Sequence, residues 1–335
     1  MWYGPNVPRR EKMKRRTLIL LGCFLASSGA ASVFATSNAI ADDILKVAIG
    51  QINNWDNQIP QLGQRAGIFK KHGLILQIIG TQGAGETLQA VNSGIDIGIG
   101  VGTVGVMRAY IKGANIRVIS AAFTGVGDIY WYVRADSPIK KPQDATNKHM
   151  IAFSTNGAAS DYIVRAFAKE LGVKARPVAT GSAAPTLVQV LAGHLDIGWA
   201  SPPIGLEELQ EGKIRIFARG SDLPTMRNQT TRVQIANADT LKDRKEVIVR
   251  FMQAYREALE WMYSDARALK YYSEAIGKPE TLLASSRQQF HPKEAMSPDR
   301  LSDIDSIMAN AVALKFLEKP LTRDELSELI QIPPP

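Results

Sequence analysis

Hydrophobic and polar positions follow two different periods along most of the chain. Short apolar runs such as Leu45 to Ile49 and Leu74 to Ile79 have the length of buried strands and end at glycine. Between them, Gln61 to Phe69 places apolar residues at helical spacing before a Lys-His-Gly turn. Strands that are apolar on both faces and are separated by helices are typical of a mostly parallel sheet covered on both sides. The pattern therefore predicts an α/β fold.

Two segments about a hundred residues apart repeat one pattern. Thr87 to Gly94 and Thr186 to Gly193 are identical at four of eight positions, and each is followed by a hydrophobic-Asp-Ile-Gly run. The repeated unit reads as a helix, a glycine stop and a buried strand. Asp96 and Asp196 occupy equivalent places at the strand starts, and we interpret both as structural. Two copies predict two lobes with a ligand cleft between them.

The second half of the chain begins a new alternation. Met150 to Phe153 predicts a strand, Ser154 to Ser160 a loop, and Asp161 to Glu170 a helix. Thr231 to Ala236 predicts another strand, and the apolar face from Val247 to Met262 predicts a long amphipathic helix.

The net charge and its distribution along the chain indicate which classes of molecule the protein can bind. The chain of 335 residues carries a formal charge of +8. Its first sixteen residues hold six basic residues against one acidic one, so most of the excess lies there. The rest mixes both signs and lacks the basic stripe that phosphate backbones require, so we predict no nucleic-acid partner.

Residues 1–41 predict a secretory signal peptide. Basic residues lead into an apolar stretch from Thr17 to Ala26, and Ala39-Ile-Ala41 fits a cleavage site. Cleavage after Ala41 would remove Cys23, the only cysteine, and exclude disulfides and thiolate metal sites from the mature chain.

Three alternatives stay open at this end of the chain. Met13 is a second candidate start, and Arg15-Arg16 has part of a twin-arginine signal. Leu20-Leu-Gly-Cys23 is similar to a lipoprotein box, which would anchor the protein through Cys23. Each alternative leads to the same prediction of an exported protein, located in the periplasm.

Gly100 to Gly105 fits the G-x-G-x-x-G pattern of dinucleotide-binding loops. The strand candidate that follows, Ile116 to Ala122, ends without the acidic residue that would hold a ribose. The equivalent loop of the second copy, after Gly198, lacks the glycines. We therefore predict no cofactor.

Ser/Thr/Gly loops follow three predicted strands, at Thr81 to Gly85, Ser154 to Ser160 and Thr180 to Ser182. Hydroxyls and free N–H groups at helix N-termini favour an anionic ligand, although the same residues also serve as helix caps. Trp55 and Trp199 lie in loops, where each could form a wall for a solute or pack between loops.

Titratable residues form no recognisable catalytic pattern. The four histidines are scattered without metal-ligand spacing, and no serine lies in a G-x-S-x-G elbow. We predict no catalytic residues and no metal site.

The motif from Ala66 to Leu74, Ala-Gly-Ile-Phe-Lys-Lys-His-Gly-Leu, and the later run from Leu88 through Gly98 resemble a known family. They are similar to solute-binding proteins of ABC transporters, in the nitrate/sulfonate/taurine (NitT/TauT) group. The resemblance implies a two-lobed periplasmic-binding-protein fold of type II, whose lobes are joined by two crossover segments. Residues 42–134 with 228–335 would form lobe one, and residues 135–227 would form lobe two.

The resemblance also implies where a ligand would bind, because the family's binding loops map onto this chain by position. The candidate ligand-binding residues are Gln51, Asn53, Trp55, Thr81, Gly83, Gly102, Thr103, Ser154, Thr155, Asn156, Ser160, Trp199 and Ser201.

The implied function is capture of a small organic anion, of the sulfonate, nitrate or carboxylate type, without catalysis. The partners would be the permease and ATPase subunits of an importer, and we expect the protein to act as a monomer. Alternatives are a neutral pyrimidine precursor of thiamine as the ligand, a sensor role, or an exported enzyme that uses the same cleft. The eukaryotic pyrimidine synthases on this fold depend on a Cys-rich motif, which the mature chain lacks.

Overall fold

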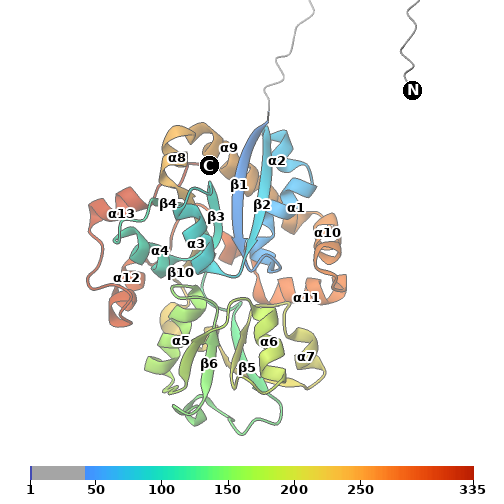
Figure 1. Ribbon diagram of the computed structural model, residues 1–335, viewed down its shortest axis with the longest axis vertical. Coiled ribbons are helices and arrows are strands. Elements are labelled where there is room, and N and C mark those ends of the chain that lie inside the picture. Colours follow the sequence, from blue (N-terminus) through green and yellow to red (C-terminus); the bar gives the residue numbers. More distant parts are fainter. Residues whose placement is uncertain (2–41) are drawn as a thin grey trace, which may run out of the picture. The chain divides into compact units, whose positions relative to one another are not determined.

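The computed structural model describes Met1 and residues 42–335. The predicted signal peptide therefore lies, except for Met1, outside the described residues. Across residues 42–335, no helix combines the length and the hydrophobicity needed to cross a membrane. The chain from residue 42 onward forms two sheets with helices around them (Figure 1).

The larger sheet belongs to lobe one and has the strand order β2-β1-β3-β10-β4. Strand β1 pairs in parallel with β2 and β3, whereas β10 runs antiparallel to both β3 and β4. The late strand β10 thus lies inside the sheet. The bounds are β1 Asp43–Gly50, β2 Leu74–Thr81, β3 Ile97–Gly102, β4 Ile116–Thr124 and β10 Thr230–Asn237.

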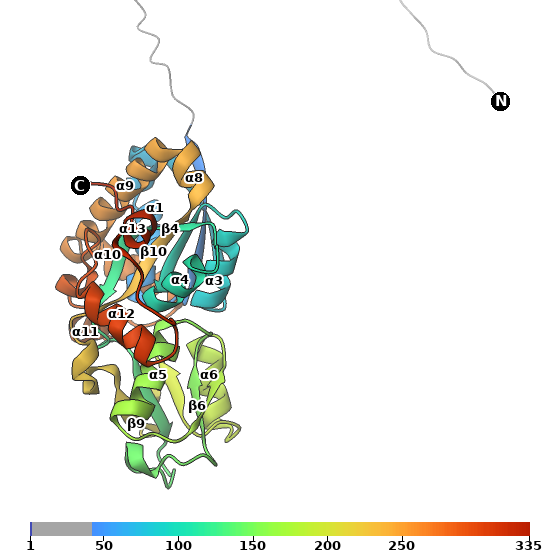
Figure 2. The same cartoon turned by 90° about the vertical axis from the view of Figure 1, so that its left-hand side faces the viewer.

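Helices cover both faces of this sheet, as the apolar pattern predicted. One face packs its side chains against α1, α2 and α9, with Phe69 and Phe251 at the centre of that core. The other face packs against α3 and α4, and the C-terminal helices lie beside the edge strand β4, which Ile330 joins through a bridge to Val118 (Figures 1 and 2). The bounds are α1 Ile59–Arg65, α2 Ile68–Lys71, α3 Ala84–Asn92, α4 Thr103–Tyr110, α8 Ala238–Asp243, α9 Lys245–Ser264, α10 Arg267–Ile276, α11 Glu280–Phe290, α12 Ile304–Ala313 and α13 Arg323–Leu329.

The smaller sheet belongs to lobe two. It consists of the triplet β8-β5-β9 and the parallel pair β6-β7, joined by a bridge between Ile151 and Ile197. Its helices are α5, α6 and α7. The bounds are β5 Tyr130–Arg134, β6 Met150–Phe153, β7 Arg176–Ala179, β8 Gly198–Ala200, β9 Ile214–Arg219, α5 Ala159–Glu170, α6 Ala183–Leu191 and α7 Leu206–Gln210.

Strand β5 differs from the sequence prediction, which kept residues up to Arg134 in lobe one. In the structure β5 pairs antiparallel with β8 and β9, so it lies in the sheet of lobe two. The first crossover consequently occupies residues 125–129. Tyr130 to Val133 are apolar enough for either core, and the choice depends on pairing with strands that come much later in the sequence.

The sequence repeat has a structural counterpart in paired threonines. The Thr81 and Thr87 hydroxyls lie 2.6 Å apart in lobe one, and those of Thr180 and Thr186 lie 2.7 Å apart in lobe two. Each pair joins a strand end to the helix that follows it. The same residue types therefore fix the same strand-to-helix turn twice.

The repeated aspartates are also equivalent. The Asp96 carboxylate accepts a 2.7 Å hydrogen bond from the Lys46 backbone N–H, and that of Asp196 accepts a 2.8 Å bond from Met150. Both carboxylates therefore bond the backbone of a neighbouring strand. These bonds support the structural interpretation of both residues.

The two crossovers run side by side. The Gly125 N–H donates to the Gln229 carbonyl at 2.8 Å, and the Thr231 hydroxyl donates to the Gly125 carbonyl at 2.7 Å. Gly125 has a φ of 90°, a left-handed conformation that favours glycine. The connection between the lobes is thus a short hydrogen-bonded pair of segments.

Candidate functional site

A small cavity lies between the lobes. Its volume is about 40 Å³, and because about 10–15 Å³ suffices for one water, it holds a group of only a few heavy atoms. Two larger hollows, of about 650 and 800 Å³, are lined by residues of lobe one alone. The cavity is lined by Gly50, Gln51, Asn54, Asp56, Asn57, Ala84, Gly100 and Arg232 from lobe one, Ile129 from the crossover, and Ser154, Ala158, Ala159, Ser160, Trp199 and Ser201 from lobe two.

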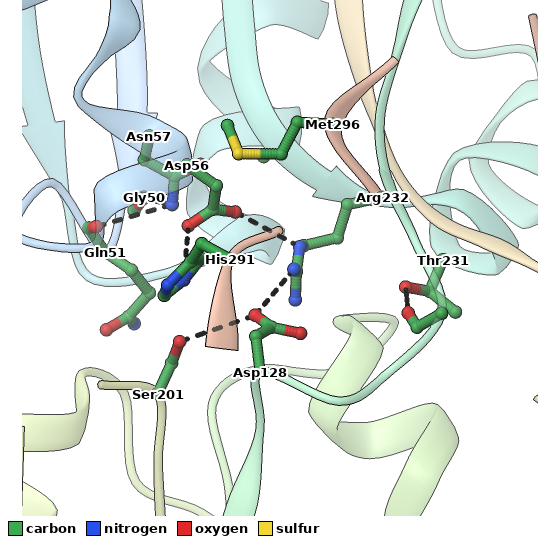
Figure 3. Close-up of polar contacts among 12 residues, drawn as sticks. Gly50, Gln51, Asp56, Asn57, Asp128, Ser201, Thr231, Arg232, His291 and Met296 are labelled. Carbon is green, nitrogen blue, oxygen red and sulfur yellow. Dashed lines mark hydrogen bonds and ion pairs between the residues drawn. The ribbon is translucent and has the colours of Figure 1, made fainter. Parts of the chain in front are cut away.

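Lobe one contributes charge to this cavity (Figure 3). The guanidinium of Arg232, on β10, lies 2.6 Å from the Asp128 carboxylate and 3.4 Å from the Asp56 carboxylate. It also lies 4.4 Å from the centre of the Phe123 ring, at cation–π distance. All three charged side chains are buried, so each depends on the others for compensation.

Burial shifts the protonation of this cluster. It raises the pKa of the Asp128 carboxyl, against the opposing effect of Arg232. It also lowers the pKa of the fully buried His291, which follows α11, so that His291 is neutral at neutral pH. For Arg232, burial lowers the pKa but the charges of Asp128 and Asp56 outweigh it, and the pKa is raised.

Two carboxylate oxygens of this cluster, Asp56 Oδ1 and Asp128 Oδ1, have no hydrogen-bond partner within residues 42–335, and of these two residues only Asp56 lines the cavity. Asp56 Oδ1 is buried and has no hydrogen-bond partner among residues 42–335, although it lies 3.8 Å from His291 Nε2. Asn57 Oδ1 is likewise unpartnered within the described chain. Both residues line the cavity. The lobe-one wall therefore presents oxygen acceptors to a bound group.

Asp56, Asp128 and His291 also come close enough to be tested as a metal site. Their nearest ligand atoms lie within 4.8 Å of one another. Ligands about 2.1 Å from a tetrahedral zinc ion lie about 3.4 Å apart, and Asp56 Oδ1 and His291 Nε2 lie 3.8 Å apart. Arg232 already supplies the cation that the two carboxylates need. The residues fit an arginine-neutralised carboxylate pair better than a metal centre.

Lobe two contributes neutral donors. Ser154 Oγ and Trp199 Nε1 line the cavity, and neither has a hydrogen-bond partner in the described part of the chain. The N-terminus of α5 forms the wall at Ala158, Ala159 and Ser160, and within residues 42–335 no side chain caps this helix. Its first-turn amides and dipole favour a negative group. The two walls therefore have opposite polarity.

Glycines allow the two lobes to touch around the cavity. A Cβ on Gly105 or Gly102 would overlap the carbonyl oxygen of Gly157, and one on Gly83 would overlap Ser154 Oγ. The Gly85 N–H donates to Thr155 Oγ1 at 2.8 Å across the same seam. The structure therefore represents a closed arrangement of the lobes.

The structure brings some of the predicted site residues together at the cavity. The predicted residues that line it are Gln51, Ser154, Ser160, Trp199 and Ser201. Ser160 Oγ accepts a 2.9 Å bond from the Ser154 N–H, and Ser201 Oγ lies 3.4 Å from Asp128 Oδ2. Their contact with a ligand stays a prediction.

Two other predicted site residues, Trp55 and Thr103, do not line the cavity. Trp55 is buried in the core of lobe one, with its ring edge-on to Tyr263 and Tyr272 and its N–H donating to the Tyr263 hydroxyl at 3.0 Å. Of the two roles that the sequence left open for Trp55, the structure shows the packing role. Thr103 is also structural, because its hydroxyl donates to the Thr230 carbonyl at 2.7 Å.

The remaining predicted residues surround the cavity without lining it. Gly83, Gly102 and Thr155 form the seam between the lobes. Asn53 and Thr81 line a separate groove at the cleft mouth, and Asn156 lines a shallow one beside α4.

The charged cluster was not predicted from the sequence. Asp56, Asp128, Arg232 and His291 come from four distant segments, so no local spacing links them. One signal was present: Arg232 interrupts a strand whose residues are all buried. A buried arginine requires a carboxylate partner, and that requirement points to a charged site.

A family model described as NMT1/THI5 like matches residues 61–268. A search of the curated proteins finds no match.

Solved structures share the fold. The alkanesulfonate-binding protein SsuA from Xanthomonas axonopodis pv. citri, bound to MOPS, has a TM-score of 0.71 at 17% identity, covering 87% of this chain and 99% of that one. The aliphatic sulphonate-binding protein SsuA from Escherichia coli has a TM-score of 0.67 at 18% identity, covering 87% and 92%. The nitrate-binding protein NrtA from Synechocystis PCC 6803 has a TM-score of 0.65 at 12% identity, covering 87% and 86%. These matches confirm the predicted periplasmic-binding-protein fold.

Proposed function

The chain belongs to the NMT1/THI5-like family, and we propose on this premise that it is the solute-binding subunit of an ABC importer. It would capture a small solute in the periplasm and deliver it to a permease without making or breaking bonds. Ligand contacts would favour the closed arrangement, which the membrane partner then recognises. The family resemblance and the cavity shared by both lobes support this role.

The charges of the cavity define the ligand more closely. The Asp56 and Asp128 carboxyl groups share a single guanidinium, and Asp56 Oδ1 at the cavity wall is left without a hydrogen-bond partner among residues 42–335. The N-termini of α3 and α5 reach the cavity at Ala84 and Ala159, and the positive end of each helix dipole also lies beside an acidic residue of its own first turn, Glu86 or Asp161. A ligand that carries a positive group at one end and a negative group at the other matches this arrangement.

We therefore favour an organic anion that also carries a cationic nitrogen, such as an amino sulfonate or an amino acid. Its nitrogen would donate to Asp56 Oδ1 and Asn57 Oδ1, which have no partners within residues 42–335. Its anionic group would accept from Ser154, Trp199 and the first turn of α5. Nitrate and simple sulfonates lack the nitrogen donor and would leave Asp56 Oδ1 buried without a hydrogen-bond partner.

An aminopyrimidine is the second candidate. Its amino group and ring nitrogen offer a donor beside an acceptor, which suits the Asp56 carboxylate and the Trp199 N–H. Such a ligand is neutral and brings no cation to the Asp56 carboxylate, so it ranks below the zwitterion.

An enzyme would need a titratable pair poised for proton transfer in the cleft. The pair that comes nearest is Asp56 and His291, at 3.8 Å, and His291 lies behind the cavity lining. The Asp128 carboxylate is held by Arg232 at 2.6 Å. This geometry favours binding over catalysis.

Titration calorimetry of residues 42–335 tests the ligand class. Taurine and β-alanine should bind at least about tenfold more tightly than ethanesulfonate, propionate and nitrate. Asp56→Asn should remove this preference, because the amide cannot compensate a cation. The matched control is Asp305→Asn, an exposed residue on α12. Tighter binding of nitrate or simple sulfonates, unchanged in Asp56→Asn, would overturn the proposed ligand class.

A further inference from the structure

A second hollow adjoins the cavity at the mouth of the cleft. This mouth groove has a volume of about 280 Å³, several times that of the cavity. Gln51 and Asn54 line both spaces, so the two hollows meet at these residues. Lobe one supplies the wall at Thr81 and Gln82, and lobe two supplies it at Ser182 and Ala184. The groove therefore takes its shape only when the lobes are closed.

The chemistry of the mouth groove differs from that of the cavity. None of its lining residues within the described chain is charged. The wall alternates amide and hydroxyl groups with the apolar side chains of Ile52, Ala184 and Ile204. A charged group would lose hydration there without gaining a partner, whereas an uncharged chain would lose little. The groove suits a neutral, partly aliphatic segment.

Gln51 stands between the two spaces and bridges the lobes. Its side-chain amide donates to the Gln82 carbonyl at 3.3 Å and accepts from the Ala183 N–H at 3.3 Å. Both bonds are longer than the usual 2.9–3.0 Å, so each is weak and little is lost when the side chain turns aside. Gln51 can therefore make way for a ligand that passes from the cavity to the groove.

We infer that the solute has two parts: a small charged head in the cavity and an uncharged tail of several heavy atoms in the mouth groove. This inference rests on the proposed solute-binding function and adds a tail-binding subsite to it. Gln51 and Asn54 surround the junction between head and tail. The cavity alone excludes most organic molecules by size, and the groove is where the rest of a larger solute fits.

A chain-length series tests the subsite with the protein of residues 42–335. Titration calorimetry would compare glycine, 2-aminobutyrate, norvaline and norleucine, and likewise taurine with its N-alkyl derivatives. Each added methylene should tighten binding about fourfold until the groove is filled, because each one leaves water. Affinity that stays level or falls along both series would overturn the tail subsite.

Ala184→Phe fills the groove from α6 and should reduce the affinity for norleucine to that for glycine, leaving glycine unchanged. Val188→Phe adds the same ring one turn further along α6, at a side chain that is 66% exposed, and should change neither affinity. Ile204→Phe fills the groove from another segment and repeats the test.

The outcomes separate the two proposals. Binding of the short heads without any gain from tails would refute the subsite and leave the proposed function standing. Failure of every member of both series to bind would refute the proposed ligand class and the subsite together.

Discussion

The two walls of the cavity differ in how far their polar groups are already paired with other groups of the protein. The lobe-one wall contains a buried cluster in which Asp56, Asp128 and Arg232 form ion pairs, although Asp56 Oδ1 and Asp128 Oδ1 accept no hydrogen bond within residues 42–335. The lobe-two wall presents Ser154 Oγ and Trp199 Nε1, which have no partner among residues 42–335. Groups that satisfy one another contribute to the fold, whereas groups that await a partner contribute to binding. The comparison predicts that the two walls respond differently to substitution.

Removal of Arg232 should have the largest effect. Arg232→Met leaves two carboxylates buried without a cation, and the free energy of unfolding at pH 7 should fall by about 3–5 kcal/mol. Urea denaturation would measure the loss, with Arg219→Met at an exposed site as the control. Adding Asp128→Leu to Arg232→Met should recover part of the stability. A loss as small as that of the control would show that the charged wall does not stabilise the fold.

Gly105→Ala tests the glycine contacts through which the two lobes touch around the cavity. A Cβ there overlaps the Gly157 carbonyl only when the lobes are closed, so affinity for taurine should fall about 10- to 100-fold. The unliganded protein should keep its stability or gain up to about 1 kcal/mol, because alanine is the better helix former. Gly80→Ala is the control, since among residues 42–335 no atom lies within 4 Å of its added Cβ. Unchanged affinity in Gly105→Ala would show that closure does not require this contact.

His291 gives the charged wall a pH dependence. Burial among Asp56, Asp128, Arg232 and Phe123 lowers the pKa of His291, so the unfolded chain binds its proton at a higher pH than the folded protein does. Stability from this group is therefore complete above about pH 6.5 and declines as the pH falls, by up to about 1.4 kcal/mol per pH unit. His291→Gln should flatten the decline measured by denaturation, whereas the exposed His194→Gln should not. An identical pH profile in His291→Gln would contradict the assignment.

Substitution of Ser154 and of Ser160 should have the smallest effects, and it compares an unpaired hydroxyl directly with a hydrogen-bonded one. Ser154→Ala removes a hydroxyl without a partner in the described chain and should weaken ligand binding about fivefold, with stability changed by less than about 0.5 kcal/mol. Ser160→Ala removes an acceptor bonded at 2.9 Å to the Ser154 N–H and should lower stability by about 1 kcal/mol. Calorimetry and denaturation of both variants would separate binding from folding. A loss of stability in Ser154→Ala equal to that in Ser160→Ala would remove the distinction.

Most of the fold could be predicted from local patterns. The repeat from Thr87 and that from Thr186 both form the helix and strand that their sequences indicate. Strand β5 could not be assigned to a sheet, because its apolar residues fit either core and its partners β8 and β9 follow it by many residues. Pairing between distant strands has no local signature.

The residues of the candidate site also fall into a group that could be predicted from the sequence and a group that could not. Ser154 and Ser201 follow β6 and β8, Trp199 lies within β8 and Ser160 within α5, and the family resemblance mapped all four to the cleft. The charged cluster needs β10 and the segment after α11 to fold back onto the first crossover, which no spacing encodes. Trp55 shows the reverse error, since a tryptophan in a loop can turn into the core as readily as into a cleft.

Strand β10 has a consequence for how the polypeptide is made. It lies between β3 and β4, yet the ribosome adds it only after the whole of lobe two. A nascent chain that stops before residue 230 therefore exposes two unpaired strand edges, which invite association with other chains. The first lobe to be synthesised is thus the last to be completed, and its assembly waits for nearly two hundred residues to emerge.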